Sequence, residues 1–139
     1  MAEIDHSIPL EGTEVSVGIV EKGSKILLVQ RKYKEHHVLN WQFPAGKIKA
    51  SETPENAAER EVYEETGVKC TAERVLGHRT HPITGVRIHY VVCEHNAGNG
   101  SVRDHSEIKN LAWVHPRDLK AYIPDYMYSG VLKHFDLAT

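Results

Sequence analysis

The first regular pattern along the chain is an alternation of apolar and polar positions. Val15, Val17 and Ile19 alternate with polar residues and a glycine, which is the period of a β-strand. The segment 21–24 (EKGS) has the composition of a turn, and 25–30 (KILLVQ) is an apolar run typical of a buried strand. Together these segments predict a β-hairpin.

The pattern weakens after this hairpin. Residues 31–40 (RKYKEHHVLN) are polar and show no clear period, so they predict a loop. Residues 41–46 (WQFPAG) predict a short strand. Pro44 interrupts this strand, because proline has no N–H to donate to a neighbouring strand.

The clearest helix signal follows the short strand. Thr53 suits the N-cap, Pro54 the first helical position, and Gly67 the left-handed position that ends many helices. Apolar residues recur between these signals, at Ala57, Ala58 and Val62. The segment 54–66 is therefore predicted to be one helix.

Strands dominate the remainder of the chain. The pattern predicts strands over 69–80, 86–94 and 108–114, a flexible loop over 96–101, and short helices over 116–121 and 129–137. The last helix is predicted to face inward with Val131, Leu132 and Phe135. Strands and helices in this order predict one α/β domain with a mixed sheet over residues 1–139, preceded within it by a flexible segment over 1–12.

Composition and charge narrow the class of protein. The chain has 139 residues, of which 26% are charged, and a formal net charge of -2. A near-neutral chain has no overall attraction to nucleic acid or anionic membranes, so we expect neither as a partner. The N-terminus lacks the segments of a signal peptide, and Cys70 and Cys93 lack metal-type spacing. We expect a cytoplasmic monomer or homodimer with two reduced thiols.

The predicted helix carries a concentration of acidic residues. Glu61, Glu64 and Glu65 lie three or four residues apart, so we expect them to share a face opposite Ala58 and Val62. Like charges at this spacing repel one another, and anions near a helix C-terminus are disfavoured by the helix dipole. Such a cluster indicates either a solvated acidic face or a site for a hard cation such as Mg²⁺, Mn²⁺ or Ca²⁺.

These glutamates belong to a longer motif with fixed spacing. From Gly46 the chain reads five residues, Glu52, seven residues, Arg60, Glu61, Val62, Tyr63, Glu64, Glu65, Thr66, Gly67 and Val68. This order over 46–68 resembles the signature of the Nudix hydrolases, the MutT-like superfamily, and every fixed position is filled. The run Phe43-Pro44-Ala45 before the motif and the strand with Trp113 after it also resemble the family.

The resemblance implies a fold, a reaction and a set of ligands. The implied Nudix fold has a mixed β-sheet between helices in an α/β/α arrangement, with the motif forming a loop, a helix and a loop. Members hydrolyse a nucleoside diphosphate linked to another group and use Mg²⁺ or Mn²⁺, which offset phosphate charge and lower the pKa of bound water. The implied metal ligands are Glu61, Glu64, Glu65 and the backbone carbonyl of Ala45.

Other motif positions are implied to support these ligands. Arg60 is expected to hold a glutamate in place. Glu52 either joins the metal cluster or pairs with Arg60. Lys47 is placed either to contact a phosphate or to be solvated.

The proton acceptor for the attacking water is less fixed in the family. Glu64 and Glu65 are candidates within the motif. Glu107, six residues before Trp113, is a third candidate, because MutT-like members have a glutamate at a similar place that reaches the metals. Asp104 is the neighbour that could substitute for it.

The resemblance also indicates residues for the substrate. Arg31 and His36 match two MutT pocket residues in type and in their distance before Phe43, which is itself a candidate to stack on the base. MutT reads its purine with an asparagine two residues after a proline. The comparable stretch here is 123–126 (IPDY), so Asp125 or Tyr126 takes that place and specificity for oxidised guanine is not implied.

Three classes of function remain open at this point. The first is hydrolysis of a (d)NTP or oxidised dNTP to a monophosphate and pyrophosphate, favoured because the chain is short. The second is hydrolysis of ADP-ribose or another nucleoside diphosphate derivative, with a 5′-RNA pyrophosphohydrolase as a lesser variant. The third is a regulator that binds nucleotides without hydrolysing them, and the three intact glutamates of the motif argue against it.

Overall fold

The computed structural model describes residues 13–33 and 38–137. In chain order its elements are β1 (Glu14–Lys22), β2 (Lys25–Tyr33), β3 (Val38–Gln42), β4 (Ala45–Lys47), α1 (Pro54–Thr66), β5 (Lys69–Thr80), β6 (Arg87–Ala97), β7 (Ile108–Val114), a 3₁₀ turn (Pro116–Asp118), α2 (Leu119–Tyr122) and α3 (Ser129–His134). The segment 1–12 and His36 lie outside the described residues.

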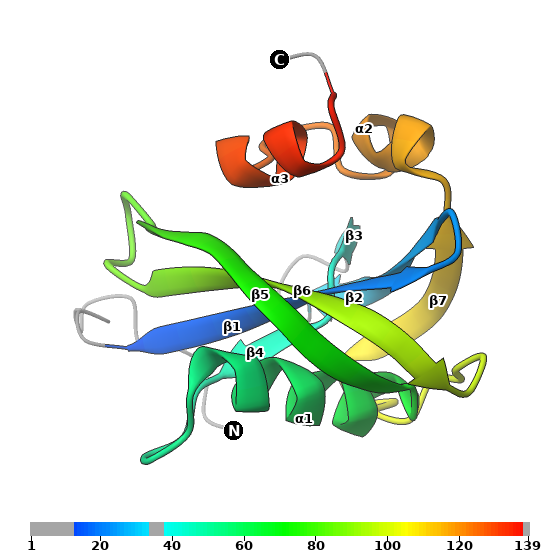
Figure 1. The fold of residues 1–139 in the computed structure, drawn as a ribbon, viewed down its shortest axis with the longest axis horizontal. Helices are drawn as coiled ribbons and strands as arrows, with labels where there is room; N and C mark the ends of the chain where they lie inside the picture. The colour runs from blue at the N-terminus through cyan, green and yellow to red at the C-terminus, as the bar shows by residue number, and fades with distance from the viewer. Residues whose placement is uncertain (1–12, 34–37, 138–139) are drawn as a thin grey trace.

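The strands form one mixed sheet between two layers of helices. The order is β3-β2-β1-β6-β5, with β4 paired to β1 and β7 paired to β2. Strands β1 and β6 run parallel, and the other pairs are antiparallel. Helix α1 covers one face of the sheet, while α2 and α3 lie on the opposite side (Figure 1). The predicted α/β/α arrangement is confirmed.

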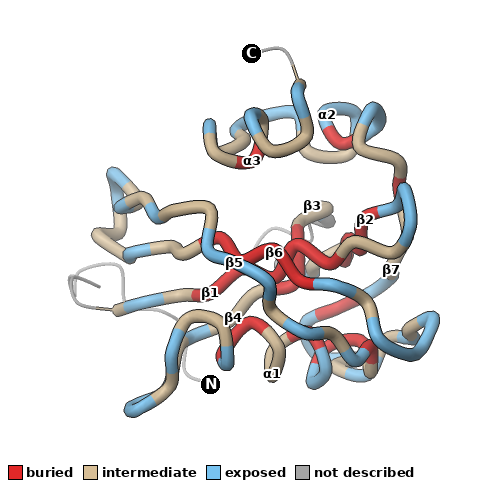
Figure 2. The backbone as a smooth tube through the Cα atoms, viewed as in Figure 1, coloured by how far each residue is buried: buried red, intermediate tan, exposed pale blue. Residues whose placement is uncertain are grey.

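Apolar residues fill both sides of the sheet, and burial is greatest in its central strands (Figure 2). The cluster under α1 includes Val20, Val62 and Val91. Gly18 brings α1 close to β1, because a Cβ at this position would lie 2.6 Å from Cγ2 of Val62. The cluster on the opposite face includes Leu119 of α2 and Val131 of α3. The C-terminal helices therefore contribute to the core.

Helix α1 begins and ends where its sequence signals predict. The hydroxyl of Thr53 accepts a hydrogen bond from the N–H of Asn56 at 3.1 Å, which caps the first turn. Gly67 has φ 74° and donates its N–H to the carbonyl of Tyr63 at 2.8 Å. The predicted helix over 54–66 is confirmed.

The predicted loop over 31–40 is wrong at both of its ends. Strand β2 continues to Tyr33 and β3 begins at Val38, and the two strands pair through Arg31 and Asn40. Backbone hydrogen bonds hold these ends, so polar side chains are no obstacle to strand formation. In the same way β6 extends to Ala97, into the predicted loop over 96–101, because Ala97 pairs with Lys69 of β5.

The C-terminal helices are shorter than predicted. The segment 116–121 starts as a 3₁₀ turn and becomes α2 at Leu119. Helix α3 ends at His134 and not at residue 137, and Asp136 has φ 54°, which is incompatible with a continuing helix. Val131 is buried, whereas Leu132 and Phe135 are half-buried.

The two cysteines lie near the α1 face of the sheet. Both are free thiols, Cys93 fully buried and Cys70 half-buried. Cys93 belongs to the apolar cluster under α1, where it acts as a small apolar side chain. Among the helices of the described residues, none has the length and apolar character needed to span a bilayer.

Candidate active site

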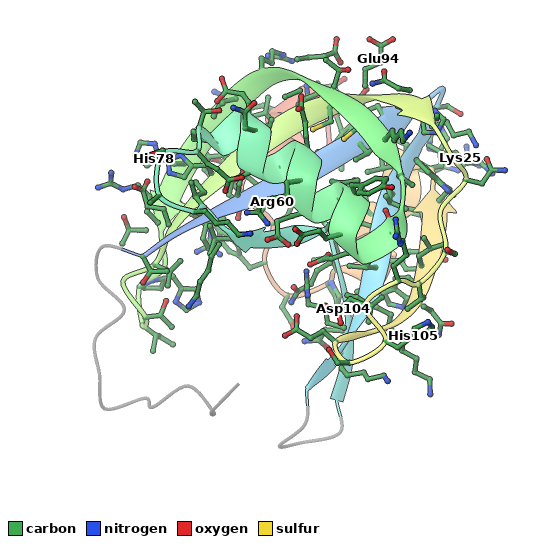
Figure 3. The ribbon with its side chains drawn as sticks, turned by 90° about the horizontal axis from the view of Figure 1, so that it is seen from below. Lys25, Arg60, His78, Glu94, Asp104 and His105 are labelled. Carbon is green, nitrogen blue, oxygen red and sulfur yellow. The ribbon has the colours of Figure 1, made fainter. Side chains whose placement is uncertain are left out.

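Three glutamates of α1 differ sharply in their exposure. The side chain of Glu64 is 52% exposed and that of Glu61 15%, while Glu65 is buried. The expected common face opposite the apolar residues is only partly observed, because Glu65 lies on the buried side of the helix with Val62. Figure 3 views the molecule from the side of α1, with Arg60 of this helix labelled.

Arg60 gathers three carboxylates around one guanidinium. Its Nε and Nη2 donate to the two oxygens of Glu52, at 2.7 and 2.9 Å. Its Nη1 donates to Oε1 of Glu61 at 2.7 Å and to Oε2 of Glu64 at 3.3 Å. Nη2 also donates to the carbonyl of Lys47 at 2.9 Å. The position expected for an orienting arginine thus contacts two proposed metal ligands directly.

Glu52 pairs with Arg60, which is one of its two expected roles. Its Oε1 also accepts the N–H of Lys49 at 2.8 Å. The hydrogen bonds from Arg60 and from this backbone N–H lower the pKa of Glu52 to about 2. Both oxygens of Glu52 are therefore engaged in anchoring Arg60.

Arg31 of β2 forms a second centre of positive charge. Its Nη2 donates to both oxygens of Glu65, at 3.0 and 2.8 Å, and to the carbonyl of Ala45 at 3.0 Å. Its Nη1 lies 3.7 Å from Oε2 of Glu107, whose side chain is 63% exposed. Arg31, which was expected to bind substrate, is thus bound to Glu65 and lies beside Glu107.

Burial changes the proton affinity of two of these carboxylates. Burial raises the pKa of Glu65 to about 7, although the Arg31 guanidinium opposes the shift. Burial also raises the pKa of Glu61, against the opposing effect of Arg60. Both acids therefore bind protons more readily than exposed glutamates.

Gly46 fixes the position of Glu61. A Cβ on residue 46 would lie 2.1 Å from Cδ of Glu61 and 2.4 Å from each of its oxygens. Gly46 belongs to β4 and pairs with Ser16 of β1. The carboxylate of α1 is thus seated directly against the backbone of the sheet.

The oxygen atoms of the site accept hydrogen bonds from two guanidinium groups. Nη1 of Arg60 is bonded to Glu61 and Glu64, and Nη2 of Arg31 is bonded to Glu65 and to the carbonyl of Ala45. Within 13–33 and 38–137, no group of three or more His, Cys, Asp or Glu side chains is arranged to hold a metal ion. The donors are nevertheless carboxylate and carbonyl oxygens, which is the set that Mg²⁺ and Mn²⁺ prefer.

We expect the burial of Glu65 to make the stability of the metal-free protein depend on pH. Its pKa is about 7 in the folded protein against 4.5 for an ordinary glutamate, so between these values the folded state binds more protons than the unfolded state. The free energy of unfolding therefore falls as the pH rises from 4.5 to 7, and it levels off above that. The loss from this group is about 3 kcal/mol.

Urea unfolding in a metal chelator, at about pH 5 and about pH 8, measures this loss. Glu65→Gln is the matched variant, since glutamine keeps the shape of the side chain and does not titrate. The other titratable groups are present in both proteins. The pH-dependent loss should therefore be larger in the wild type, and an equal loss in both proteins would contradict the assignment.

A cavity of about 330 Å³ lies on the opposite face of the sheet. Its lining residues are Val15, Val17, Gln42, Phe43, Ala45, Arg79, His81, Ile88, Tyr90, Ile123, Tyr126, Met127 and Tyr128. Tyr90 and Tyr128 stack with ring centroids 4.5 Å apart. Gly77 leaves room for this arrangement, because a Cβ there would lie 2.3 Å from the hydroxyl of Tyr128. The cavity is thus an aromatic pocket of the size of small-molecule sites.

The expected substrate residues divide between this cavity and the acidic cluster. Phe43 and Tyr126 line the cavity, whereas Arg31 lies in the acidic cluster. Asp125 is exposed and is not part of the lining, and Lys47 is an exposed residue of β4. Asp104 accepts a hydrogen bond from the hydroxyl of Ser106 at 2.6 Å in the loop before Glu107.

Sequence reasoning missed the polar wall of the cavity. Arg79 and His81 come from the end of β5 and the turn that follows, and Tyr90 comes from β6. The signal that could have found them is the period of two in the predicted strands, which places Arg79 and His81 on one face.

Comparisons with known proteins agree with the fold and the motif. A family model for the NUDIX domain matches residues 12–131. The CTP pyrophosphohydrolase of Escherichia coli K12 is 29% identical over 109 residues, which cover 78% of this chain and 80% of that protein. A MutT-like protein of Streptomyces ambofaciens is 26% identical over 113 residues, covering 81% of this chain and 70% of that protein.

A solved structure shows the same fold. A MutT structure, from an analysis of the Aliivibrio salmonicida and Vibrio cholerae proteins, superposes with a TM-score of 0.69 at 23% identity and covers 91% of this chain and 98% of its own. The family model spans most of the chain, including the acidic helix and the strands around it. The chain therefore belongs to the NUDIX domain family, and the protein is a Nudix hydrolase.

Proposed function

We propose that this protein hydrolyses nucleoside triphosphates, ordinary or oxidised, to a monophosphate and pyrophosphate by attack of water on phosphorus. The observation that carries the proposal is that the acidic cluster and the cavity share Ala45. Its carbonyl accepts a hydrogen bond from Arg31, and the same residue lines the cavity. A nucleotide with its base in the cavity is therefore expected to place its phosphates beside the glutamates. Similarity to a CTP pyrophosphohydrolase supports a triphosphate substrate.

The proposed cofactor is Mg²⁺ or Mn²⁺, held by Glu61, Glu64, Glu65 and the carbonyl of Ala45. When bound, such an ion offsets phosphate charge and lowers the pKa of a water molecule. Arg60, anchored on Glu52, holds Glu61 and Glu64 in position. Glu64, Glu65 and Glu107 are the candidates to accept the proton of the attacking water. Arg31 supplies positive charge between Glu65 and Glu107.

The test is product analysis with Mg²⁺ and a panel of nucleotides. The panel holds GTP, CTP, ATP, 8-oxo-dGTP, ADP-ribose and a dinucleoside polyphosphate, and anion-exchange chromatography separates the products. We expect at least one triphosphate to give equal amounts of monophosphate and pyrophosphate, and a chelator to stop the reaction.

Three results would contradict this proposal. Turnover of ADP-ribose alone would assign the protein to hydrolases of nucleoside diphosphate derivatives. Release of a nucleoside diphosphate and inorganic phosphate would show that the bond between the β- and γ-phosphates is cleaved instead. Nucleotide binding without turnover would indicate a regulator.

We also propose that the protein is a single domain located in the cytoplasm, which the two free thiols support.

A further inference from the structure

The polar groups of the cavity are unevenly distributed around its wall. Arg79 lies at the end of β5, and its Nε donates to the hydroxyl of Tyr90 at 3.1 Å. Its Cζ lies 4.4 Å from the ring centroid of Tyr126. The guanidinium is therefore held at its edge by one tyrosine and at its face by another. A guanidinium carries five N–H donors and no acceptor.

His81 adds a second donor to the same wall. Its Nδ1 accepts the backbone N–H groups of Ile83 and Thr84, each at 3.2 Å. A ring nitrogen that accepts these bonds carries no proton, so the proton of the neutral imidazole is on Nε2. Both residues line the cavity, and both side chains can donate hydrogen bonds.

The rest of the lining does not impose a comparable preference. Gln42 and the tyrosine hydroxyls can both donate and accept hydrogen bonds. The rings of Phe43, Tyr126 and Tyr128 suit any base, because every base has a face on which an aromatic ring can stack. Discrimination between bases therefore depends on Arg79 and His81.

We propose that Arg79, assisted by His81, selects nucleotides whose base presents a carbonyl oxygen beside an unprotonated ring nitrogen. This inference rests on the proposed function, because it takes the cavity to be the base site. Guanine (O6 and N7) and cytosine (O2 and N3) carry this pair of acceptors. Adenine places an amino donor beside N7, and 8-oxoguanine carries a hydrogen on N7. The proposal thus predicts ordinary GTP or CTP as the better substrates.

The first experiment measures kcat/KM of the Mg²⁺-loaded wild type for GTP, CTP, ATP, 8-oxo-GTP and 7-deaza-GTP. The last analogue lacks the N7 acceptor and is otherwise a guanine nucleotide. We expect GTP or CTP to exceed ATP and 8-oxo-GTP by about tenfold or more. If GTP is the better of the two, kcat/KM for 7-deaza-GTP should be lower than for GTP. A preference for CTP would mean that O2 and N3 of cytosine are the acceptors that Arg79 recognises. Equal values for ATP and the better of GTP and CTP would overturn the proposal.

The second experiment removes the guanidinium. Arg79→Met retains a long unbranched side chain without donors, and the ratio of the preferred nucleotide to ATP should fall toward one, mainly through KM. Arg87→Met is the matched control, because Arg87 is an exposed arginine of β6 outside the cavity lining. The control should keep the wild-type ratio. An unchanged ratio in a folded Arg79→Met protein would overturn the proposal.

A binding measurement separates this inference from the proposed reaction. Calorimetric titration with GMP, CMP and AMP reports base preference without any turnover. If no triphosphate is hydrolysed but GMP or CMP binds about tenfold more tightly than AMP, and Arg79→Met removes the difference, the base selection stands and the proposed reaction fails. If triphosphates are hydrolysed but the three monophosphates bind equally well, the reaction stands and the base selection fails.

Discussion

Glu64→Gln is expected to abolish nearly all hydrolysis while leaving the fold intact. The side chain of Glu64 is 52% exposed and lies 3.3 Å from Arg60, so the substitution removes little packing. As a proposed metal ligand, however, the residue loses its negative charge and a hard oxygen donor. We expect kcat to fall about 10³-fold or more, which corresponds to about 4 kcal/mol. The free energy of unfolding should change by less than about 0.5 kcal/mol.

Steady-state kinetics at saturating Mg²⁺, with the best substrate of the panel, measure this loss. Glu55→Gln is the matched control, because Glu55 is an acid in the first turn of the same helix. Its turnover should remain that of the wild type. Wild-type turnover in Glu64→Gln would remove Glu64 from the metal site, and circular dichroism distinguishes a lost ligand from a lost fold.

Gly46→Ala is expected to impair the reaction because the added methyl group displaces the carboxylate of Glu61. The new Cβ would lie 2.1 Å from Cδ of Glu61, so the carboxylate must shift by an ångström or more. A displacement of about 1 Å in a catalytic group is worth about 10² in rate. We expect a fall of this size in kcat/KM, together with weaker binding of Mn²⁺ in a calorimetric titration.

Gly23→Ala controls for the general effect of a glycine substitution. No heavy atom lies within 4 Å of a Cβ at Gly23, although its φ of 60° makes alanine unfavourable there. This variant should lose about 1 kcal/mol of stability and retain activity. If Gly46→Ala is as active as the control, the close contact of Glu61 with the backbone of β4 is not needed for the reaction.

The parts of the fold set by neighbours in the sequence could be predicted well. Helix α1 was predicted at both ends because Thr53, Pro54 and Gly67 act within one turn of the helix. Strand β7 was also predicted at both ends, over 108–114. Other strand ends, held by partner strands where their own residues are polar, could not be predicted. Arg31 is polar and gives no strand signal, yet it pairs with Asn40 on one side and Ile108 on the other.

The candidate site divides in the same way. The motif placed three glutamates on one helix and Arg60 beside them, because their spacing alone brings them together. The contact between Arg31 and Glu65 joins residues that are 34 positions apart, and it depends on how α1 lies against the sheet. Arg79 was missed for a related reason, since the cavity forms only where β5 meets the C-terminal segment.

The placement of α1 and the C-terminal segment on opposite faces of the sheet has a consequence for how the protein can diversify (Figure 1). The acids of α1 belong to one face, while Ile123, Tyr126 and Tyr128 close the cavity on the other. Ala45 is the shared point between them. If the cavity is the base site, as proposed, substitutions at Arg79 or in the segment 123–128 can alter which nucleotide is accepted without touching the groups proposed to break the bond. Substrate specificity can then change, in evolution or by design, while the acidic residues of α1 stay the same.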